Sequence, residues 1–353
     1  MNIEEQRLIL ALPSKGRLQE QSFNFLSGCG FDVRRIGNGR EYTAKLAGID
    51  KVDIIYFRPD EIPIRIDQGD AHLGITGEDL YLEFGDGQSG SHLLMPRLGF
   101  GAARLVVAVP QSWVDVTSMD DLEEVALLFH QKRGRSLRIA TKFSRLTRAF
   151  FADRGIVEYT LVESLGATEG APSSGVADLI VDLTSTGATL AQNHLKEVTG
   201  GTVLRTEACL VASLRAGLWT AQAMAALEQI VEQVEARTRA TSKLVLRFSI
   251  PSKKSSYVRT ELTTRYECSL TSWSATSESV IVPRGGTFDF VVALCTRTKL
   301  YAAVKFLKSS GAAEIIVDRS EFVFEETSQA LERFRQLIRR QDTEGRSKSV
   351  AVR

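Results

Sequence analysis

The chain has 353 residues, enough for two or three domains with separate hydrophobic cores. Its 43% hydrophobic and 25% charged residues are typical of a globular protein in water. The 44 basic residues nearly balance the 43 acidic ones, so the net charge of the chain does not favour binding to nucleic acid or to an anionic membrane. Any site for a polyanion must therefore be local.

The cysteines and the N-terminus favour a cytoplasmic protein. Four cysteines lie far apart without metal-ligand spacing, which predicts reduced core residues: Cys29, Cys209, Cys268 and Cys295. The start, MNIEEQ, is acidic and precedes only a short apolar run, so we expect neither a signal peptide nor a transit peptide. No stretch approaches the roughly 20 apolar residues that a membrane span needs.

The first residues predict a strand, a basic turn and a helix. Residues 8–12 are apolar and end at Pro13. Lys15 and Arg17 flank a glycine in the turn, and an amphipathic helix continues to Gly30. Two cations at the end of a strand favour an anion site, and the alternative is a solvated Lys/Arg pair.

A second buried strand is predicted at residues 52–57, followed at once by Arg58. The forked guanidinium of Arg58 can hold a pyrophosphate. Alternatively, it pairs on the surface with Asp60 or Glu61.

Residues 71–79 predict a short strand, a glycine-rich turn that contains Gly77, and an acidic helix start. His72 lies in this strand, where a histidine is more often a hydrogen-bonded structural residue than a catalyst. Residues 83–97 are rich in Gly and Ser and predict a mobile surface loop.

A second lobe is expected to begin at Pro110, after a predicted strand at 104–109. Ser118 predicts the N-cap of the next helix. The strand predicted at 137–140 then leads into a basic turn that contains Thr141.

Two further turns follow in this lobe. Residues 161–172 predict a glycine-rich loop that contains Glu169. The stretch 177–190 predicts a buried strand with Asp182 at its end, and then a helix. Small and hydroxylic residues connect them: Thr184, Ser185, Thr186, Gly187, Ala188 and Thr189. A carboxylate beside such a turn suits a ribose diol and a phosphate, and the alternative is an ordinary capped connection.

The rest of the chain predicts a return to the first lobe at residues 204–211, a helix at 219–240, and a different kind of module. Its predicted strands and helix are 244–250, 280–282, 289–295, 299–310 (the helix) and 314–317. This order is βαββαβ-like, although 252–279 is not assigned. A helix at 325–340 and a disordered tail complete the prediction.

Five motifs together identify a family. LPSKGRL, GITGEDL, RIATKF, SLGATEGAP and ADLIVDLTSTGATL occur in this order within residues 7–213. The chain resembles ATP phosphoribosyltransferase, the first enzyme of histidine biosynthesis.

The resemblance implies the fold class: α/β, with a bilobal periplasmic-binding-protein-like catalytic core and a C-terminal ferredoxin-like or ACT-like α+β domain. The expected boundaries are 1–109 with 202–240 for lobe I, 110–201 for lobe II, 241–324 for the regulatory domain, and 325–353 for the last helix and tail.

The resemblance also implies the reaction, in which adenine N1 of ATP attacks the anomeric carbon of phosphoribosyl pyrophosphate and pyrophosphate leaves. No general base is obligatory, because N1 is unprotonated at neutral pH. We assign Lys15, Arg17 and Arg58 to the leaving group, with Mg²⁺ held chiefly by the substrates. The expected substrate-binding residues are Asp182, Thr184, Ser185, Thr186, Gly187, Ala188, Thr189, Gly77, Glu169 and Thr141.

The C-terminal module implies feedback inhibition by histidine and assembly of homodimers into hexamers. The catalytic motifs resemble short-form enzymes, which lack such a domain, whereas FLKSSGAAEIIV weakly resembles the long form. Many relatives have aspartate in place of His72. Two alternatives remain at this point: a bilobal solute-binding or effector-sensing protein, and a non-catalytic regulatory paralogue.

Overall fold

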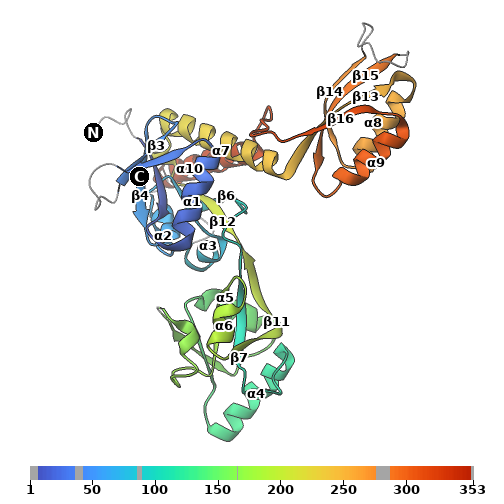
Figure 1. Ribbon diagram of the computed structural model, residues 1–353. Helices are drawn as coiled ribbons and strands as arrows, with labels where there is room; N and C mark the ends of the chain where they lie inside the picture. The colour runs from blue at the N-terminus through green and yellow to red at the C-terminus, as the bar shows by residue number, and fades with distance from the viewer. Residues whose placement is uncertain (1–6, 36–42, 86–89, 165, 276–286, 351–353) are drawn as a thin grey trace. The chain divides into compact units, whose positions relative to one another are not determined.

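A computed structural model describes residues 7–35, 43–85, 90–164, 166–275 and 287–350 (Figure 1). The chain divides into two compact units. Unit 1 contains Met1–Glu228 and Gln329–Arg353, and unit 2 contains Gln229–Ser328. Among the described residues, every helix is too short or too polar to span a membrane.

The first sheet of unit 1 has seven strands in the order β2-β3-β4-β1-β5-β12-β6. Its strands are β1 (Leu8–Pro13), β2 (Asp32–Arg35), β3 (Thr43–Ala47), β4 (Val52–Phe57), β5 (Leu73–Gly77), β6 (Ser91–Met95) and β12 (Ala208–Ser213). Its helices are α1 (Gly16–Gly28), α2 (Ile62–Gln68) and α3 (Glu78–Phe84). All five residues of β5 are buried, as expected for a strand covered on both faces.

The second sheet of unit 1 has five strands in the order β11-β7-β10-β8-β9. They are β7 (Ala103–Pro110), β8 (Leu137–Thr141), β9 (Tyr159–Glu163), β10 (Leu179–Thr184) and β11 (Leu195–Thr206). The connecting helices are α4 (Met119–Arg133), α5 (Ser144–Ala152), the 3₁₀ turn Thr168–Gly170 and α6 (Ala188–Gln192). Ser118 caps α4 reciprocally with Asp121, which confirms the predicted N-cap.

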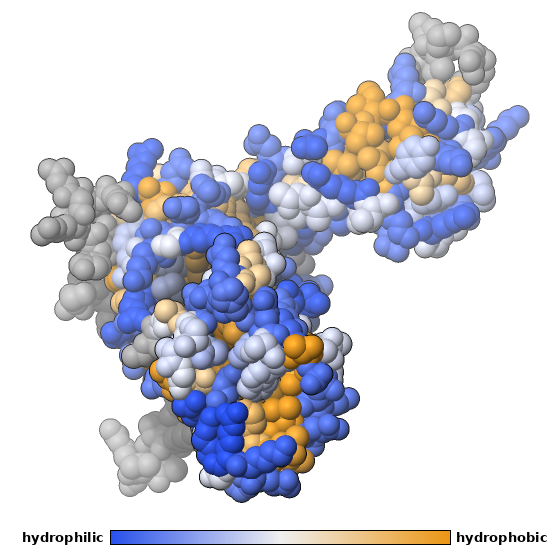
Figure 2. Space-filling view, turned by 60° about the horizontal axis from the view of Figure 1, so that its bottom comes forward, coloured by the Kyte–Doolittle hydropathy of each residue, from blue (hydrophilic) through white to orange (hydrophobic). Residues whose placement is uncertain are grey.

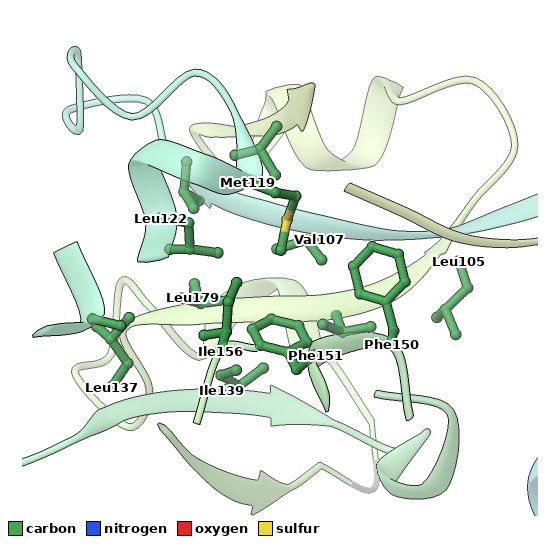
Figure 3. Close-up of a cluster of buried hydrophobic side chains, with 14 of the residues drawn as sticks. Leu105, Val107, Met119, Leu122, Leu137, Ile139, Phe150, Phe151, Ile156 and Leu179 are labelled. Carbon is green, nitrogen blue, oxygen red and sulfur yellow. The ribbon is translucent and has the colours of Figure 1, made fainter. Parts of the chain in front are cut away.

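Alternate residues of these strands build the core of the second sheet. Leu105, Val107 and Leu179 point to one face and pack against helices α4 and α5 (Figure 3). Phe151 of α5 is fully buried there. This face is therefore held by apolar burial, which leaves the ends of the strands for polar groups.

The two sheets repeat one plan. Three parallel strands stand side by side, β4-β1-β5 in one sheet and β9-β8-β10 in the other. An antiparallel strand, β12 or β7, follows, and a last strand, β6 or β11, lies at the edge. This repeat is the bilobal periplasmic-binding-protein-like core that the resemblance predicts.

Three details of the sequence prediction are wrong. Strand β7 pairs with β10 and β11, so the chain enters the second sheet before Ala103 and not at Pro110. The apolar run 204–211 is two strands in different sheets, separated at Glu207. Residues 83–97 contain strand β6, which hydrophobic periodicity could not reveal among so many small polar residues.

Two long helices remain. Helix α7 (Ala221–Ser242) follows the 3₁₀ turn Ala216–Leu218, beginning in unit 1 and ending in unit 2, and α10 (Gln329–Val350) belongs to unit 1. Phe334 of α10 is fully buried against Trp219, with ring centroids 5.0 Å apart. The tail predicted to be disordered is helical up to Val350.

Unit 2 contains a four-stranded antiparallel sheet in the order β14-β15-β13-β16. Its elements are β13 (Lys243–Pro251), the 3₁₀ turn Ser252–Lys254, α8 (Ser255–Thr264), β14 (Ser269–Ala275), β15 (Phe288–Thr296), α9 (Leu300–Ser310) and β16 (Ala313–Asp318). The βαββαβ prediction is confirmed, and α8 and β14 now account for most of 252–279. The strand predicted at 280–282 lies outside the described residues.

Candidate functional site

A pocket of about 290 Å³ in unit 1 is lined from both of its sheets. Arg17 and Leu18 come from α1, Asp79 from α3, and Ser185 from the turn after β10. An adjoining cavity of about 360 Å³ also contains Ser185 and adds charged side chains: Arg97, Arg104, Arg205 and Glu207. The sequence-predicted turn therefore borders both cavities.

The turn after β10 is organised by its own hydroxyls. The Gly187 amide donates to Thr184 Oγ1 over 2.8 Å, and the Ala188 amide to Thr186 Oγ1 over 3.4 Å. Gly187 has φ of 79°, a left-handed conformation that favours glycine. The predicted helix after the turn is present as α6, which starts at Ala188 and is five residues long.

Asp182 lies within β10, two residues before its end, whereas the sequence predicted it at the end of the strand. Burial raises the pKa of its carboxyl group. The Leu183 amide, which donates to Oδ1 over 2.8 Å, and the charge of Lys142 both oppose this rise, whereas Glu169 adds to it. Asp182 is thus a partly desolvated carboxylate with capacity to accept further hydrogen bonds.

Asp79 is a site residue that the sequence did not single out. Its side chain is 4% exposed, and Oδ1 accepts a 2.7 Å hydrogen bond from Thr206 Oγ1. Its Oδ2 is buried without a hydrogen-bond partner among the described residues. Burial raises the pKa of this carboxyl group too, although Thr206, local amides and Lys142 lower it. Thr206 is 127 residues away in sequence, so only the fold reveals this environment.

The lack of a side chain at Gly77 leaves space for the Asp79 carboxylate. A Cβ atom at Gly77 would lie 2.4 Å from Asp79 Oδ1, closer than real contacts allow. Gly77 also precedes the first turn of α3, whose amides favour a carboxylate. The predicted role of Gly77 thus includes space for a neighbouring carboxylate.

The three predicted cations differ in position. Lys15 is exposed at the N-cap of α1, whereas Arg17 lines the 290 Å³ pocket. Arg58 follows β4 with its side chain 59% exposed and pairs with Asp60 over 3.1 Å. Its amide donates to Glu61. The structure brings Arg17 to the pocket lining, but neither Lys15 nor Arg58.

Two other predicted residues lie near Asp182. Glu169 is in the 3₁₀ turn after β9 and acts on Asp182 through its charge. Thr141 is fully buried at the end of β8, and its hydroxyl accepts a 2.9 Å hydrogen bond from the Phe143 amide. Thr141 therefore shapes the turn that carries Lys142.

His72 is a structural residue, as the sequence interpretation favoured. It is fully buried, and Nδ1 accepts a 3.0 Å hydrogen bond from the Ile9 amide. Nε2 therefore carries the proton and donates to the Leu218 carbonyl over 3.0 Å. Burial lowers the pKa of the ring, which keeps it neutral.

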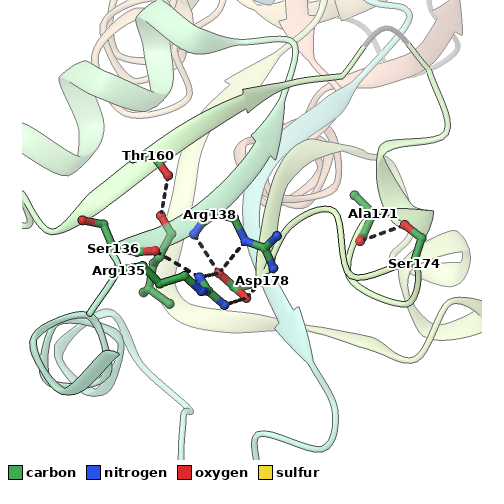
Figure 4. Close-up of polar contacts among 8 residues, drawn as sticks. Arg135, Ser136, Arg138, Thr160, Ala171, Ser174 and Asp178 are labelled. Atoms are coloured by element: carbon green, nitrogen blue, oxygen red, sulfur yellow. Dashed lines mark hydrogen bonds and ion pairs between the residues drawn. The ribbon is translucent and has the colours of Figure 1, made fainter. Parts of the chain in front are cut away.

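The opposite end of β10 carries a different carboxylate, Asp178. Arg135 donates to it through two nitrogens over 2.6 and 2.8 Å, and Arg138 adds its amide and its guanidinium (Figure 4). These hydrogen bonds hold the pKa of Asp178 far below its usual range, despite burial. All its acceptor capacity is used within the fold.

Comparison with known proteins agrees with this arrangement. The family described as ATP phosphoribosyltransferase matches residues 58–236. An ATP phosphoribosyltransferase of Caulobacter vibrioides (strain NA1000 / CB15N) is 39% identical over 332 residues, covering 94% of this chain and 98% of its own. One from Rhodopseudomonas palustris (strain BisB18) is 41% identical over 319 residues, with coverages of 90% and 94%.

A solved structure, an ATP phosphoribosyl transferase (HisG:HisZ) complex from Thermotoga maritima, is 25% identical with a TM-score of 0.48, over 65% of this chain and 98% of that one. The sequence matches are long, and they span nearly the whole of the relatives. The chain belongs to the ATP phosphoribosyltransferase family, pentosyl-transferring enzymes that catalyse the first step of histidine biosynthesis.

Proposed function

We propose that the 290 Å³ pocket is where adenine N1 of ATP attacks the anomeric carbon of phosphoribosyl pyrophosphate. One observation carries this proposal: a cation of α1, a buried carboxylate of α3 and the hydroxyl turn after β10 line the same pocket. The reaction needs alignment of the two substrates and stabilisation of the departing pyrophosphate, more than it needs a base.

The phosphoribosyl group belongs on the β10 side. Asp182 accepts the ribose hydroxyls, because a desolvated carboxylate with one internal hydrogen bond has acceptor capacity left. The turn from Ser185 to Thr189 surrounds the 5′-phosphate with amides and hydroxyls. The internal hydrogen bonds of Thr184 and Thr186 support this role, because they fix the turn before substrate binds. Thr141 and Glu169 complete the substrate-binding set: Thr141 shapes the turn that carries Lys142, and the charge of Glu169 raises the pKa of Asp182.

The leaving pyrophosphate faces the cations. Arg17 lines the pocket, and Lys15 stands two residues before it at the start of α1. The adjoining cavity adds Arg97 and Arg205. Arg58 joins this group only by giving up its exposed ion pair with Asp60, a pair that is worth little in water.

Magnesium fits a site built mainly from the substrates' phosphate oxygens. The described residues contain no group of three or more His, Cys, Asp or Glu side chains able to hold a metal. Asp182 and Glu169 would supply the protein's oxygens, since the charge of Glu169 acts on Asp182 and raises its pKa. Bound Mg²⁺ supplies charge neutralisation on the pyrophosphate.

Asp79 suits the adenine. Leu18, Leu80 and Leu183 give the pocket apolar walls for a flat ring. The Oδ2 atom of Asp79 is an acceptor for the exocyclic amino group of the ring. Alkylation at N1 puts positive charge on that amino group, so the carboxylate binds the transition state more strongly than the ground state.

Unit 2 is assigned to regulation by histidine and to assembly, and the two sheets of unit 1 to catalysis. We set the lobe boundaries near residues 102 and 207, which the strand pairing supports. Figure 2 shows an apolar patch on unit 2, and two exposed residues, Phe290 and Ile316, lie on the sheet face away from its helices. Burial of this face between subunits supports homo-oligomers, from dimers to hexamers.

Ultraviolet detection of phosphoribosyl-ATP tests the proposal. The full chain with ATP, phosphoribosyl pyrophosphate and Mg²⁺ should form product, lose activity with a chelator, and be inhibited by histidine. A chain that binds both substrates but forms no product would be the non-catalytic paralogue. Activity indifferent to histidine would remove the regulatory role of unit 2.

Variants of the cations locate the leaving group. Arg17→Ala should lower turnover by about 10²- to 10³-fold, since it removes a transition-state donor. Arg148→Ala, at an exposed position on α5, is the matched control and should leave turnover unchanged. Arg58→Ala should resemble Arg17→Ala, whereas normal turnover would mean that Arg58 serves only its surface pair.

A further inference from the structure

Two cysteines of unit 2 face each other across neighbouring strands. Ser269, the first residue of β14, is paired with Leu294 of β15, and one further step of this register places Cys268 opposite Cys295. Directly opposite Cα atoms in antiparallel strands lie about 4.5–5.5 Å apart. Disulfides join Cα atoms that are about 4.4–6.8 Å apart, so the backbone already has the spacing that a disulfide needs.

The two side chains also point to the same side of the sheet. Cys268 is 2% exposed and Cys295 is fully buried, and both belong to the core cluster beneath α8 and α9. The two thiols interact directly, and their hydrogen bond, together with burial, raises the pKa of Cys268. The strand register and the contact between the two thiols therefore both favour a bond between them.

The edge position of β14 gives an oxidant a route to these buried thiols. Ser269, Thr271 and Ser272 are exposed, so little apolar surface holds this part of the strand in place. Glu267, just before Cys268, has φ of 54°, an unfavourable conformation for a residue other than glycine. Both features favour brief local opening at Cys268 over opening at the central strand.

We propose that Cys268 and Cys295 are an oxidative modification site, at which a small-molecule disulfide converts the two thiols into an intramolecular disulfide. Local opening removes the contact with Cys295 and the burial that raise the pKa of the Cys268 thiol. The Cys268 thiolate then attacks one sulfur of the small disulfide, forming a mixed disulfide and releasing one thiolate. The Cys295 thiolate then attacks the Cys268 sulfur and releases the second. The protein loses two protons and two electrons, and the small disulfide becomes two thiols.

The disulfide would covalently link the start of the edge strand β14 to its neighbour β15 inside the sheet. It closes the segment 268–295 into a loop, which restricts opening of β14. In a reducing compartment such a bond is transient, so the site reports oxidising conditions. The other cysteines provide internal controls, because Cys209 of β12 faces Thr76 of β5 in unit 1 and Cys29 is the C-cap of α1.

Peptide mapping of the folded, full-length chain tests the proposal. The protein is treated with oxidised glutathione, alkylated, digested without reductant and analysed by mass spectrometry. We expect one dominant linked pair, Cys268 with Cys295, that is lighter by two hydrogens and is reversed by dithiothreitol. Cys268→Ala and Cys295→Ala should abolish it, and Cys209→Ala should not.

Hydrogen exchange gives a readout that does not depend on any variant. In the oxidised wild-type chain, the amides of residues 269–272 should exchange about tenfold more slowly than in the reduced chain. The proposal is overturned if the folded chain yields only glutathione adducts or unmodified thiols while the urea-unfolded chain links readily. A scrambled mixture that includes Cys29 or Cys209 would also overturn it.

Discussion

The two ends of strand β10 carry carboxylates four residues apart with opposite environments. Asp178 accepts hydrogen bonds from Arg135 and Arg138, and its pKa is far below the usual range. Asp182 accepts one hydrogen bond, from the amide of Leu183, and burial raises the pKa of its carboxyl group. The fold thus satisfies one acid internally and leaves the other able to bind a ligand. Burial alone does not distinguish a structural acid from a functional one, whereas the partners do.

The largest expected effect is on turnover at the Asp182 end. Asp182→Asn keeps the shape but loses the charge, and should lower kcat/KM by about 10²- to 10³-fold because, in the proposed site, hydroxyls of the reacting sugar lose their charged acceptor. The unfolding free energy should change little. Steady-state kinetics and urea unfolding check this, and normal kcat/KM would place Asp182 among the structural acids.

At the other end, the effect should fall on stability. Asp178→Ala should cost about 2–3 kcal/mol of unfolding free energy, because two partly buried guanidinium groups lose their shared partner. Turnover should stay within about twofold at temperatures where the variant is folded. A variant with lost turnover and unchanged stability would reverse the comparison.

The contributions of the two acids to the unfolding free energy should depend on pH in opposite directions. The folded pKa of Asp178 is lowered, so its contribution is present above the unfolded pKa of about 3.9 and is lost as pH falls further. The folded pKa of Asp182 is raised, so its contribution is present below about pH 3.9 and is lost as pH rises through the folded pKa.

Urea unfolding across this acid range measures both. The stability difference between wild type and Asp178→Asn should shrink on acidification. On acidification, the unfolding free energy of the wild type should instead rise relative to that of Asp182→Asn. Parallel trends for the two variants would contradict the assigned environments.

The smallest effects compare two left-handed glycines. Gly187, in the turn after β10, has φ of 79°, and Gly134, at the end of α4, has φ of 62°. Alanine at either position should cost about 1 kcal/mol of stability, because a Cβ disfavours this conformation. Only Gly187→Ala should also reduce turnover, since it distorts the phosphate turn. Equal kinetics for the two variants would separate the turn from catalysis.

The sequence predicted those features that depend on local patterns. The apolar run of β10, the hydroxyl turn after it and the capping box at Ser118 all lie within a few residues. The βαββαβ order of unit 2 also followed from strand and helix lengths. Such features need no knowledge of distant contacts, so they can be read from one segment at a time.

What the sequence missed depends on distant partners. Asp178 lies 43 residues from Arg135, and Asp79 lies 127 residues from Thr206, so neither environment has a local signature. The break at Glu207 was hidden because both flanking strands are apolar. Asp79 looked like an ordinary acidic helix start, and only burial of its Oδ2 distinguishes it.

The place of β12 between β5 and β6 has a consequence for synthesis on the ribosome. Among the described strands, β6 pairs with β12 alone, and β12 is translated after the whole of the second sheet. All five strands of that second sheet lie between Ala103 and Thr206, so the sheet can form as soon as these residues have left the ribosome. The first sheet of unit 1 is therefore begun first and completed last. During synthesis, the edge of β5 that later pairs with β12 stays unpaired, and open to a chaperone, until residue 208 and those after it have been made.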